Sequence, residues 1–229
     1  MSIAENLAGI RARIDAAARA AGRDPASVTL VAVSKTFPAE AIGEALAAGQ
    51  TLFGESRAQE LRDKTPLVGE GARWHFIGSL QRNKVKYVVG RVAMVESVDS
   101  LELARELDQR VRATGGAGGP DPLPVLIEVH LGGEESKHGV DPEQVLPLAH
   151  EIARLPGLAL RGLMTIPPWQ EDPEEAAPFF EQLGALAARG RAEGLPLQDL
   201  SMGMSHDFEV AIRHGATFVR VGTAIFGAR

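Results

Sequence analysis

Eight short apolar segments, separated by longer stretches with helical periodicity, most constrain the fold of this 229-residue chain. The strand-like segments lie near residues 28–34, 51–53, 73–77, 92–96, 124–130, 158–163, 199–201 and 217–221. Helical patterns lie between them, near residues 38–48, 56–63, 81–88, 99–114, 141–154, 174–193 and 206–214. This alternation indicates a parallel sheet, because parallel neighbours need a crossover connection. Eight such units predict a closed (β/α)8 barrel of the TIM type.

We expect these elements to form one domain over residues 1–229, since a chain of this length buries a sizeable core. An open doubly wound sheet, or an error of one strand in the count, remains an alternative. Only seven residues follow Gly222, so we expect the usual last helix of such a barrel to be missing. An amphipathic helix over residues 2–22 could cover that gap. The glycine- and proline-rich residues 115–124 are interpreted as a loop before the fifth strand.

The composition excludes several kinds of chemistry. The chain has no cysteine, which rules out disulfides, thiolate nucleophiles and cysteine-based metal sites. No pair of its six histidines has a recognised zinc-binding spacing, so no metal is expected. A net charge of −6 gives no reason to expect binding to nucleic acid or to anionic lipid. The N-terminus has no signal-peptide pattern, and no apolar run approaches the roughly 18–20 residues of a membrane span. We therefore expect a cytoplasmic protein.

Lys35 ends the first predicted strand, in the segment LVAVSKT (residues 30–36). Alternation along a strand places it on the same face as Val31 and Val33. If that face lines the barrel, the amine lies at the C-terminal mouth, where such barrels hold their active sites. Desolvation against apolar walls lowers the pKa of an ammonium, and a Schiff base with an aldehyde requires a neutral amine. A strand-end lysine that extends into solvent would fit this segment as well.

The last thirty residues contain groups that could hold a phosphate. Ser201, Gly203 and Ser205 occupy the turn after the seventh strand, and Ser205 is a suitable N-cap for the helix that follows. The N–H groups at the start of that helix would attract an anion. After the eighth strand, Gly222 and Thr223 offer a bare backbone and another hydroxyl. Barrels commonly bind phosphate with the loops after strands seven and eight, although these residues could also serve only as a cap and as turns.

Arg220 shares a strand face with Phe218 and Gly222, so it is expected to point into the barrel. A buried guanidinium must find an acceptor. One candidate is a neutral ring nitrogen. The other is a buried carboxylate, for which the sequence offers Glu55, Glu96 and Glu128. Both interpretations remain open.

These segments together resemble, over essentially the full chain, the pyridoxal 5'-phosphate (PLP) homeostasis protein family. That family is a single-domain relative of the barrel domain of fold-type III PLP enzymes such as alanine racemase. The order of the matching segments is specific. They are LVAVSKT (30–36), LFGESRAQE (52–60), WHFIGSLQRNK (74–84), ESKHG (135–139), GLMTIPP (162–168), LSMGMSHDFEVAI (200–212) and VRVGTAIFGAR (219–229).

The resemblance implies a site that holds the PLP aldehyde as a Schiff base, the phosphate through hydroxyl and backbone groups, and the pyridine nitrogen through an arginine. In this sequence these residues are Lys35 for the aldehyde, Ser201, Ser205, Gly222 and Thr223 for the phosphate, and Arg220 for the ring nitrogen. The chain departs from the family at Ser56, where the commonest form of the segment FGES (53–56) has asparagine. Ser56 would lie near the cofactor, so the hydrogen bond of that asparagine is shortened, replaced by the hydroxyl or lost.

The resemblance favours a protein that buffers or delivers PLP, with PLP-dependent apoenzymes as candidate recipients. Racemisation needs a base on each face of a carbanion, and Lys35 supplies only one. In the racemases that the barrel resembles, a tyrosine on a second, β-rich domain supplies the other. No such C-terminal β domain is expected here, and the one tyrosine, Tyr87, lies in a predicted helix. A racemase-like enzyme whose other base is His75, His206 or a bound water is one alternative, and a Schiff-base aldolase acting on a sugar phosphate is another.

Overall fold

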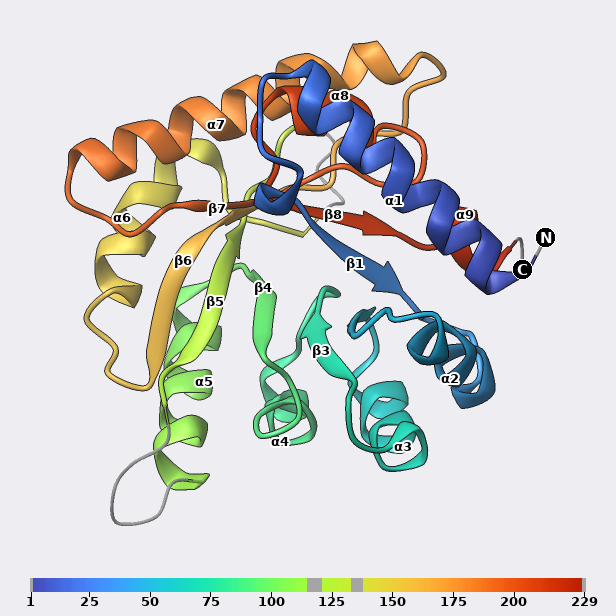
Figure 1. The fold of residues 1–229 in the computed structure, drawn as a ribbon. Coiled ribbons are helices and arrows are strands. Elements are labelled where there is room, and N and C mark those ends of the chain that lie inside the picture. The colour runs from blue at the N-terminus through green and yellow to red at the C-terminus, as the bar shows by residue number, and fades with distance from the viewer. Residues whose placement is uncertain (1, 115–120, 133–137, 228–229) are drawn as a thin grey trace.

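Eight parallel strands close into a barrel in which each strand pairs with the next and β8 returns to β1 (Figure 1). The computed structural model describes residues 2–114, 121–132 and 138–227. Within these residues the strands are β1 (Thr29–Val33), β2 (Leu52–Glu55), β3 (Arg73–Phe76), β4 (Met94–Val98), β5 (Leu123–Glu128), β6 (Leu158–Met164), β7 (Asp199–Ser201) and β8 (Phe218–Val221). The predicted (β/α)8 barrel is confirmed, and its closed order excludes an open sheet.

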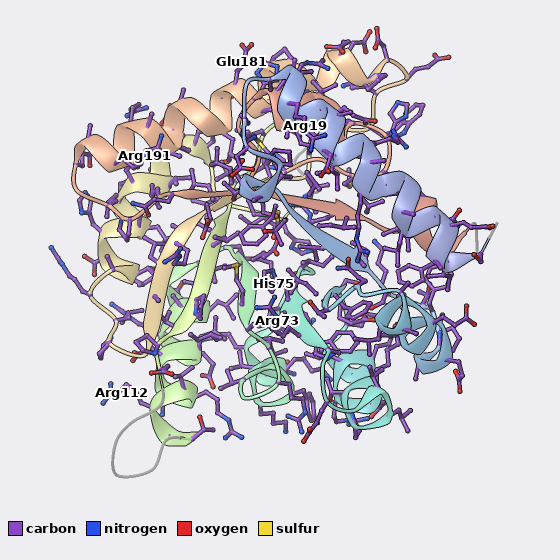
Figure 2. The ribbon with its side chains drawn as sticks, viewed as in Figure 1. Arg19, Arg73, His75, Arg112, Glu181 and Arg191 are labelled. Carbon is purple, nitrogen blue, oxygen red and sulfur yellow. The ribbon has the colours of Figure 1, made fainter. Side chains whose placement is uncertain are left out.

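Helices connect the strands and cover the outside of the barrel (Figure 1). In the described ranges they are α1 (Ile3–Ala20), α2 (Ala39–Ala47), α3 (Ala58–Val68), α4 (Val85–Val88), α5 (Leu101–Thr114), α6 (Pro142–Ile152), α7 (Ala177–Ala192), α8 (Phe208–Arg213) and α9 (Thr223–Phe226). Short 3-10 turns are η1 (Pro25–Ser27), η2 (Arg82–Lys84) and η3 (Pro173–Ala176). Charged side chains such as Arg19, Arg112 and Glu181 lie on exposed positions of these helices (Figure 2). None of the helices in the described ranges has the length and apolar character needed to cross a membrane.

The two faces of β1 meet different surroundings, as its period of two requires. Leu30 and Ala32 belong to the apolar layer between the barrel and the helices. Val33, on the other face, lines a cavity at the mouth of the barrel. Burial of a leucine or valine side chain contributes roughly 1.5–3 kcal/mol, so the layer under the helices stabilises the barrel from outside. The inward face of β1 is thereby directed toward the cavity.

The interior of the barrel changes from apolar to polar along the strands. Met94, Leu126 and Met164 form a buried cluster on which Phe218 packs. Two residues further along β4, β5 and β8 the same face carries Glu96, Glu128 and Arg220, all of them buried. Side chains two residues apart on a strand point to the same face. A layer of charged groups therefore lies on an apolar base, toward the C-terminal ends of the strands.

The first helix covers the side of the barrel where the last helix is expected to be missing. Helix α1 contacts α2, α8 and α9, and its buried side chains are Leu7, Ile10, Ile14 and Ala18. Asn6 Nδ2 donates to the carbonyl of Ile225 over 2.9 Å, and Arg13 pairs with Glu209 at 2.6 Å. The predicted covering role of this helix is confirmed. The one difference is α9, a single turn after β8 that is too short for helical periodicity to show in the sequence.

Candidate functional site

A cavity of about 330 Å³ opens at the C-terminal ends of the strands. Its walls come from the ends of β1 and β8 and from the loops that follow β2, β3, β6, β7 and β8. The lining residues are Val33, Lys35, Phe37, Ser56, Ile77, Ile166, Trp169, Met204, Ser205, His206, Arg220, Gly222 and Thr223. Six of the seven residues predicted for the site therefore line one cavity, and Ser201 does not. Barrels of this kind hold their active sites at this end.

Lys35 lies in a tight turn directly after β1. The turn is closed by the N–H of Phe37, which donates to the carbonyl of Ser34 over 3.1 Å. Thr36 has a φ of 70°, the one positive φ at a non-glycine residue in the described ranges. The left-handed region costs an ordinary residue about 1–2 kcal/mol, and it is rarest for β-branched residues. Such strain persists only where the surroundings impose it, which makes the Lys35 turn a candidate functional element.

The surroundings that impose this turn are a group of side chains between the barrel and α3, which we call the outer cluster: Ser34, Glu55, Glu60 and Lys64. Lys64 Nζ donates to Glu55 Oε1 over 2.6 Å, to Glu60 Oε2 over 3.0 Å and to the carbonyl of Ser34 over 2.9 Å. The hydroxyl of Ser34 also donates to Glu55 Oε1, over 3.0 Å. Burial raises the pKa of Glu55, although its bonds to Lys64 and Ser34 oppose the shift. The sequence analysis did not identify Glu60 or Lys64.

Ser205 faces β8 and does not cap the helix that follows it. The residue at the N-cap of α8 is Asp207, whose Oδ1 accepts the N–H of Met204 over 2.6 Å. The predicted capping role of Ser205 is therefore wrong, because the chain makes a further turn before α8 begins. Ser205 Oγ instead accepts the N–H of Gly222 over 3.2 Å and lies 3.3 Å from Thr223 Oγ1. Two hydroxyls and a backbone N–H thus meet at one edge of the cavity.

Arg220 forms the floor of the cavity and belongs to a second buried group, the interior cluster: His75, Glu96, Glu128, Ser201 and Arg220. Arg220 Nη1 donates to Ser201 Oγ over 2.5 Å, and Nη2 donates to the carbonyl of Thr165 over 2.8 Å. Its Nη1 lies 3.9 Å from Glu96 Oε2. An inward arginine with a buried carboxylate beside it was one of the two expectations, and Glu96 is that carboxylate. Glu55 is not, since it points outward to Lys64.

Ser201 is fully buried inside the barrel, below the cavity wall. Its hydroxyl donates to Glu96 Oε2 over 2.5 Å and accepts from Arg220. It is the last residue of β7, so its side chain points inward one layer below the loop that carries Ser205. Ser201 is not among the described residues that line the cavity, but its hydroxyl contacts Arg220, which does line it, so its part in a phosphate site stays a prediction.

The carboxyl groups of the interior cluster differ in protonation. Burial alone would raise the pKa of Glu96, but its contacts with His75, Arg220 and Ser201 hold that pKa below the usual value. His75 Nδ1 is 2.6 Å from Glu96 Oε1, and its ring lies near the middle of the barrel (Figure 2). Burial raises the pKa of Glu128 to about 7, with Arg220 opposing and Asp99 adding to the shift. One cation is thus matched by one ionised carboxylate and one that titrates near neutrality.

Ser56 lines the cavity beside a close contact between two loops. A side chain at Gly78 would place its Cβ 2.3 Å from the carbonyl oxygen of Ser56, so only glycine allows the loop after β3 to approach this closely. Ser97 Oγ donates to the carbonyl of Gly78 and fixes that loop. The backbone at Ser56 is therefore held in place independently of the residue type there.

Trp169 and His206 form one rim of the cavity. Their rings stack with centroids 6.0 Å apart and an angle of 25° between planes, and Trp169 remains 74% exposed. His206 Nε2 donates to the carbonyl of Glu171 over 3.0 Å. The sequence analysis considered His206 only as a base of the racemase-like alternative and did not place Trp169 among the site residues, because the loops that bring the two together are far apart in sequence. Residues 135–137 of the ESKHG motif lie outside the described residues, and His138 is exposed.

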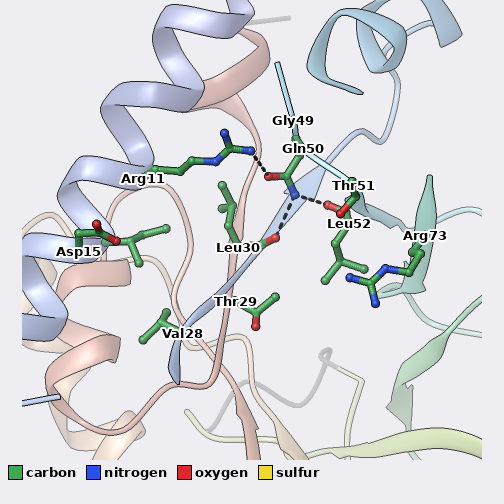
Figure 3. Close-up of a pocket in the computed structure, with 11 residues that line it drawn as sticks. Arg11, Asp15, Val28, Thr29, Leu30, Gly49, Gln50, Thr51, Leu52 and Arg73 are labelled. Atoms are coloured by element: carbon green, nitrogen blue, oxygen red, sulfur yellow. Dashed lines mark hydrogen bonds between the residues drawn. The ribbon is translucent and has the colours of Figure 1, made fainter. Parts of the chain in front are cut away.

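A second cavity, of about 290 Å³, lies at the opposite end of the strands (Figure 3). Its central polar group is Gln50, whose Nε2 donates to the carbonyls of Leu30 and Leu52. Arg11 donates to Gln50 Oε1 over 3.3 Å. These bonds join β1, β2 and α1 and satisfy the amide. The end of the barrel at which they lie is the one that serves stability rather than chemistry in this fold.

Comparison with known proteins agrees with this geometry. The family model for the alanine racemase N-terminal domain matches residues 6–229. A pyridoxal phosphate homeostasis protein of Pseudomonas aeruginosa is 47% identical over 229 residues, covering 100% of this chain and 96% of the relative. One from Aquifex aeolicus is 43% identical over 231 residues, covering 100% and 99%. The structure of PipY from Synechococcus elongatus with PLP bound has a TM-score of 0.85 at 37% identity, covering 99% of this chain and 100% of that one.

These relatives match the chain from end to end, and the matched region contains the strand-end lysine and all the loops that form the cavity. With its closed barrel and its full-length similarity to them, the chain belongs to the pyridoxal phosphate homeostasis proteins, within the family of the alanine racemase N-terminal domain.

Proposed function

We propose that this chain binds PLP in the cavity at the barrel mouth, holds it as a Schiff base on Lys35, and serves PLP homeostasis in the cell. The observation that carries the proposal is the convergence of Lys35, Ser205, Thr223 and Arg220 on one cavity. An amine, two hydroxyls and a buried cation are the groups that an aldehyde, a phosphate and an unprotonated ring nitrogen require. The family relationship supports the same assignment.

The residues present fit the cofactor in size and in chemistry. A cavity of about 330 Å³ lies at the lower end of the range for small-molecule sites. Ser205 Oγ, Thr223 Oγ1 and the N–H of Gly222 would hold the phosphate, since Ser205 Oγ lies 3.2 Å from Gly222 N and 3.3 Å from Thr223 Oγ1. Lys35 enters from β1, which pairs directly with β8. The phosphate end and the amine end are therefore built on neighbouring strands.

Arg220 would face the ring nitrogen as a permanent cation. Bound PLP supplies an aldehyde that condenses with amines and a ring that can accept negative charge. Burial lowers the pKa of Arg220, but Glu96, Glu128 and Asp207 oppose that shift, and a guanidinium stays protonated in proteins. A cation at this point disfavours a proton on the ring nitrogen, and an unprotonated ring is the weaker electron sink. Ser201 and Glu96 hold Arg220 in this position.

The groups around the cavity support a carrier over a racemase. Of the described lining residues, Lys35 and His206 have side chains of the types that act as general bases. His206 already uses its Nε2–H on the carbonyl of Glu171. Tyr87 lies on α4, where the charged groups of Arg62 and Lys86 approach its ring, and is not among the lining residues. Two opposed bases are therefore not evident among the cavity residues that the structure describes.

Further parts of the proposal rest on the family. We infer a cytoplasmic location and PLP-dependent apoenzymes as recipients of the cofactor. Ser56 would lie beside the bound ring in place of the asparagine common in the family. A hydroxyl is shorter than a carboxamide, so we expect the hydrogen bond at this position to be weaker, by up to about 1 kcal/mol.

The visible absorption spectrum of the purified protein, with and without added PLP, tests the proposal. We expect a yellow Schiff-base band that is absent from Lys35→Ala and retained in Lys86→Ala, a lysine exposed on α4. A protein that stays colourless with excess PLP would contradict PLP binding and favour the aldolase alternative. Rapid turnover of an amino acid, abolished by Lys35→Ala, would contradict the carrier role.

The phosphate assignment has its own test. Ser205→Ala combined with Thr223→Val removes both hydroxyls and should weaken PLP binding by about 100-fold or more, at roughly 1.5–3 kcal/mol for each hydrogen bond to a charged group. Binding of pyridoxal, which lacks the phosphate, should not change. Equal weakening for both ligands would show that the substitutions disturb the cavity and not a phosphate contact.

A further inference from the structure

Both peptide groups that flank Lys35 are held by side chains of helix α3. On one side, the carbonyl of Ser34 accepts a hydrogen bond from Lys64 Nζ over 2.9 Å. On the other, the N–H of Thr36 donates to Glu60 Oε2 over 2.9 Å. Lys64 and Glu60 are themselves paired at 3.0 Å, one helical turn apart. The two members of one ion pair on α3 therefore hydrogen-bond to the backbone immediately before and immediately after Lys35.

The backbone segment that these hydrogen bonds hold is also the strained one. Thr36 occupies the third position of the turn from Ser34 to Phe37, with a φ of 70°. A positive φ at that position is usual for glycine or asparagine and unfavourable for threonine. The carbonyl of Ser34 accepts from both Phe37 N–H and Lys64 Nζ, which uses both of its lone pairs. The contacts to α3 therefore add to the single turn hydrogen bond of Phe37 in holding Thr36 in this conformation.

Stability alone is a poor explanation for these contacts. Lys64 and Glu55 have side chains only 11% and 0% exposed, and Glu55 Oε2 has no hydrogen-bond partner among the described residues. Apolar side chains of similar volume often replace buried ion pairs with no loss of stability. An ion pair is directional and an apolar contact is not, because the hydrogen bonds of the ion pair fix particular backbone atoms. Here those atoms belong to Ser34 and Thr36.

We propose that Lys64 and Glu60 are positioning residues that hold the strained turn and so aim the Lys35 side chain at the aldehyde of the cofactor. The inference rests on the proposed binding of PLP to Lys35. A lysine has four rotatable bonds, and the direction in which they begin is set by the backbone at Lys35. Attack on a carbonyl requires the reacting atoms to be about 3–3.5 Å apart and aligned, and small misplacements are costly in rate.

The main test is the rate at which the PLP-free protein forms the Schiff base, followed by stopped-flow absorption. The variant is Lys64→Met with Glu55→Gln, which removes both buried charges together so that neither is left uncompensated. We expect Schiff-base formation to slow about 10- to 100-fold. Equilibrium binding of pyridoxine 5'-phosphate, which has an alcohol in place of the aldehyde, should stay unchanged because the phosphate end is intact. If Lys64 had only a structural role, the variant would both form the Schiff base more slowly and bind pyridoxine 5'-phosphate more weakly.

Glu60 gives a second test that does not depend on the buried pair, since its side chain is 23% exposed. Glu60→Ala removes the acceptor for Thr36 N–H and should slow Schiff-base formation, whereas Glu60→Gln keeps an acceptor oxygen and should restore most of the rate. Asp63→Asn is the matched control. Asp63 pairs on the same helix with Arg62, away from the turn, and should leave the rate unchanged.

Thr36→Gly distinguishes a loss of Lys35 positioning from a general disruption of the fold. Glycine adopts a positive φ without steric cost, so this substitution in the Lys64→Met, Glu55→Gln background should recover part of the lost rate. A wild-type protein that forms no Schiff base would overturn the proposed function itself. A wild type that forms it, with the double variant and Glu60→Ala equally fast, would overturn this inference alone.

Discussion

The interior cluster and the outer cluster both bury a glutamate beside a cation, but they satisfy it to different degrees. In the interior cluster, Glu96 is bonded at both oxygens, with His75 at Oε1 and Ser201 at Oε2. In the outer cluster, Glu55 accepts two bonds at Oε1, and its Oε2 has no hydrogen-bond partner in the described part of the chain. Both residues are 0% exposed. The two side chains are therefore equally inaccessible to solvent, and they differ in how their hydrogen bonds are distributed over the two carboxylate oxygens.

The pKa values of the two glutamates shift in opposite directions. Burial tends to raise both, yet the pKa of Glu96 is lowered and that of Glu55 is raised. Each carboxylate accepts two hydrogen bonds, so the charges around it decide: His75 and Arg220 lower the pKa of Glu96, whereas the like charge of Glu60 adds to the raised pKa of Glu55. The interior cluster maintains a fixed charge beside Arg220, under the cavity. The outer cluster fixes a piece of backbone and leaves one oxygen unsatisfied.

Glu96→Gln should produce the largest difference between the two clusters. The amide group cannot accept from both His75 and Ser201, and Arg220 loses its ionised neighbour. Removing one partner of a buried charge pair costs about 3–5 kcal/mol of unfolding free energy. Urea unfolding at neutral pH measures this loss of unfolding free energy.

Glu55→Gln is the matched control for this prediction. Its amide oxygen still accepts from Lys64 and Ser34, and Lys64 keeps Glu60 as an ionised partner, so we expect a loss of only about 1 kcal/mol. Equal losses for the two variants would mean that the unsatisfied oxygen of Glu55 has a partner in solution and that the clusters do not differ.

The two serines offer a second, smaller contrast. Ser201→Ala removes a hydroxyl that donates to Glu96 and accepts from Arg220, so two charged groups each lose a bond, at a cost of about 2 kcal/mol. Ser34→Ala removes one bond to Glu55, which keeps Lys64 as a donor. We expect a loss of about 0.5–1 kcal/mol there. Thermal and urea unfolding should rank the two variants in this order, and the reverse order would contradict the comparison.

The fold could be predicted because its signals are local. Buried parallel strands are short apolar runs, and the helices between them carry their own periodicity. Each strand therefore appeared in the sequence without knowledge of its neighbours. Helix α9 (Thr223–Phe226) could not be recognised in the sequence, since four residues are too few to show helical periodicity.

The site could be predicted only in part, because some roles depend on contacts between distant residues. The chemistry of Lys35 and Arg220 follows from their positions at strand ends. The capping role of Ser205 was misassigned because N-cap preference describes a residue type and not the turn that α8 actually follows. The spacing of Glu60 and Lys64 is visible as a helical pair, but nothing in the sequence indicates that α3 faces the turn after β1.

The smallest effect that separates the clusters is a pH dependence set by Glu128. Burial raises its pKa from 4.5 to about 7. The folded protein therefore holds this proton to a higher pH than the unfolded chain does. Between these two values the native state binds more protons, so stability falls as the pH rises through the window and levels off above about 7. From about pH 6 to about pH 8 we expect the wild type to lose about 1–2 kcal/mol through this group.

Glu128→Gln keeps the shape of the side chain and removes the titration, so its unfolding free energy should change less over the same pH range. Glu96 behaves in the opposite sense. Its folded pKa lies below the usual value, so its contribution is complete above about pH 4.5 and is lost only at lower pH. The deficit of Glu96→Gln should therefore be constant from about pH 6 to about pH 8. If Glu128→Gln showed the same slope as the wild type, Arg220 would be holding two ionised carboxylates, and the interior cluster would not be restricted to one fixed charge.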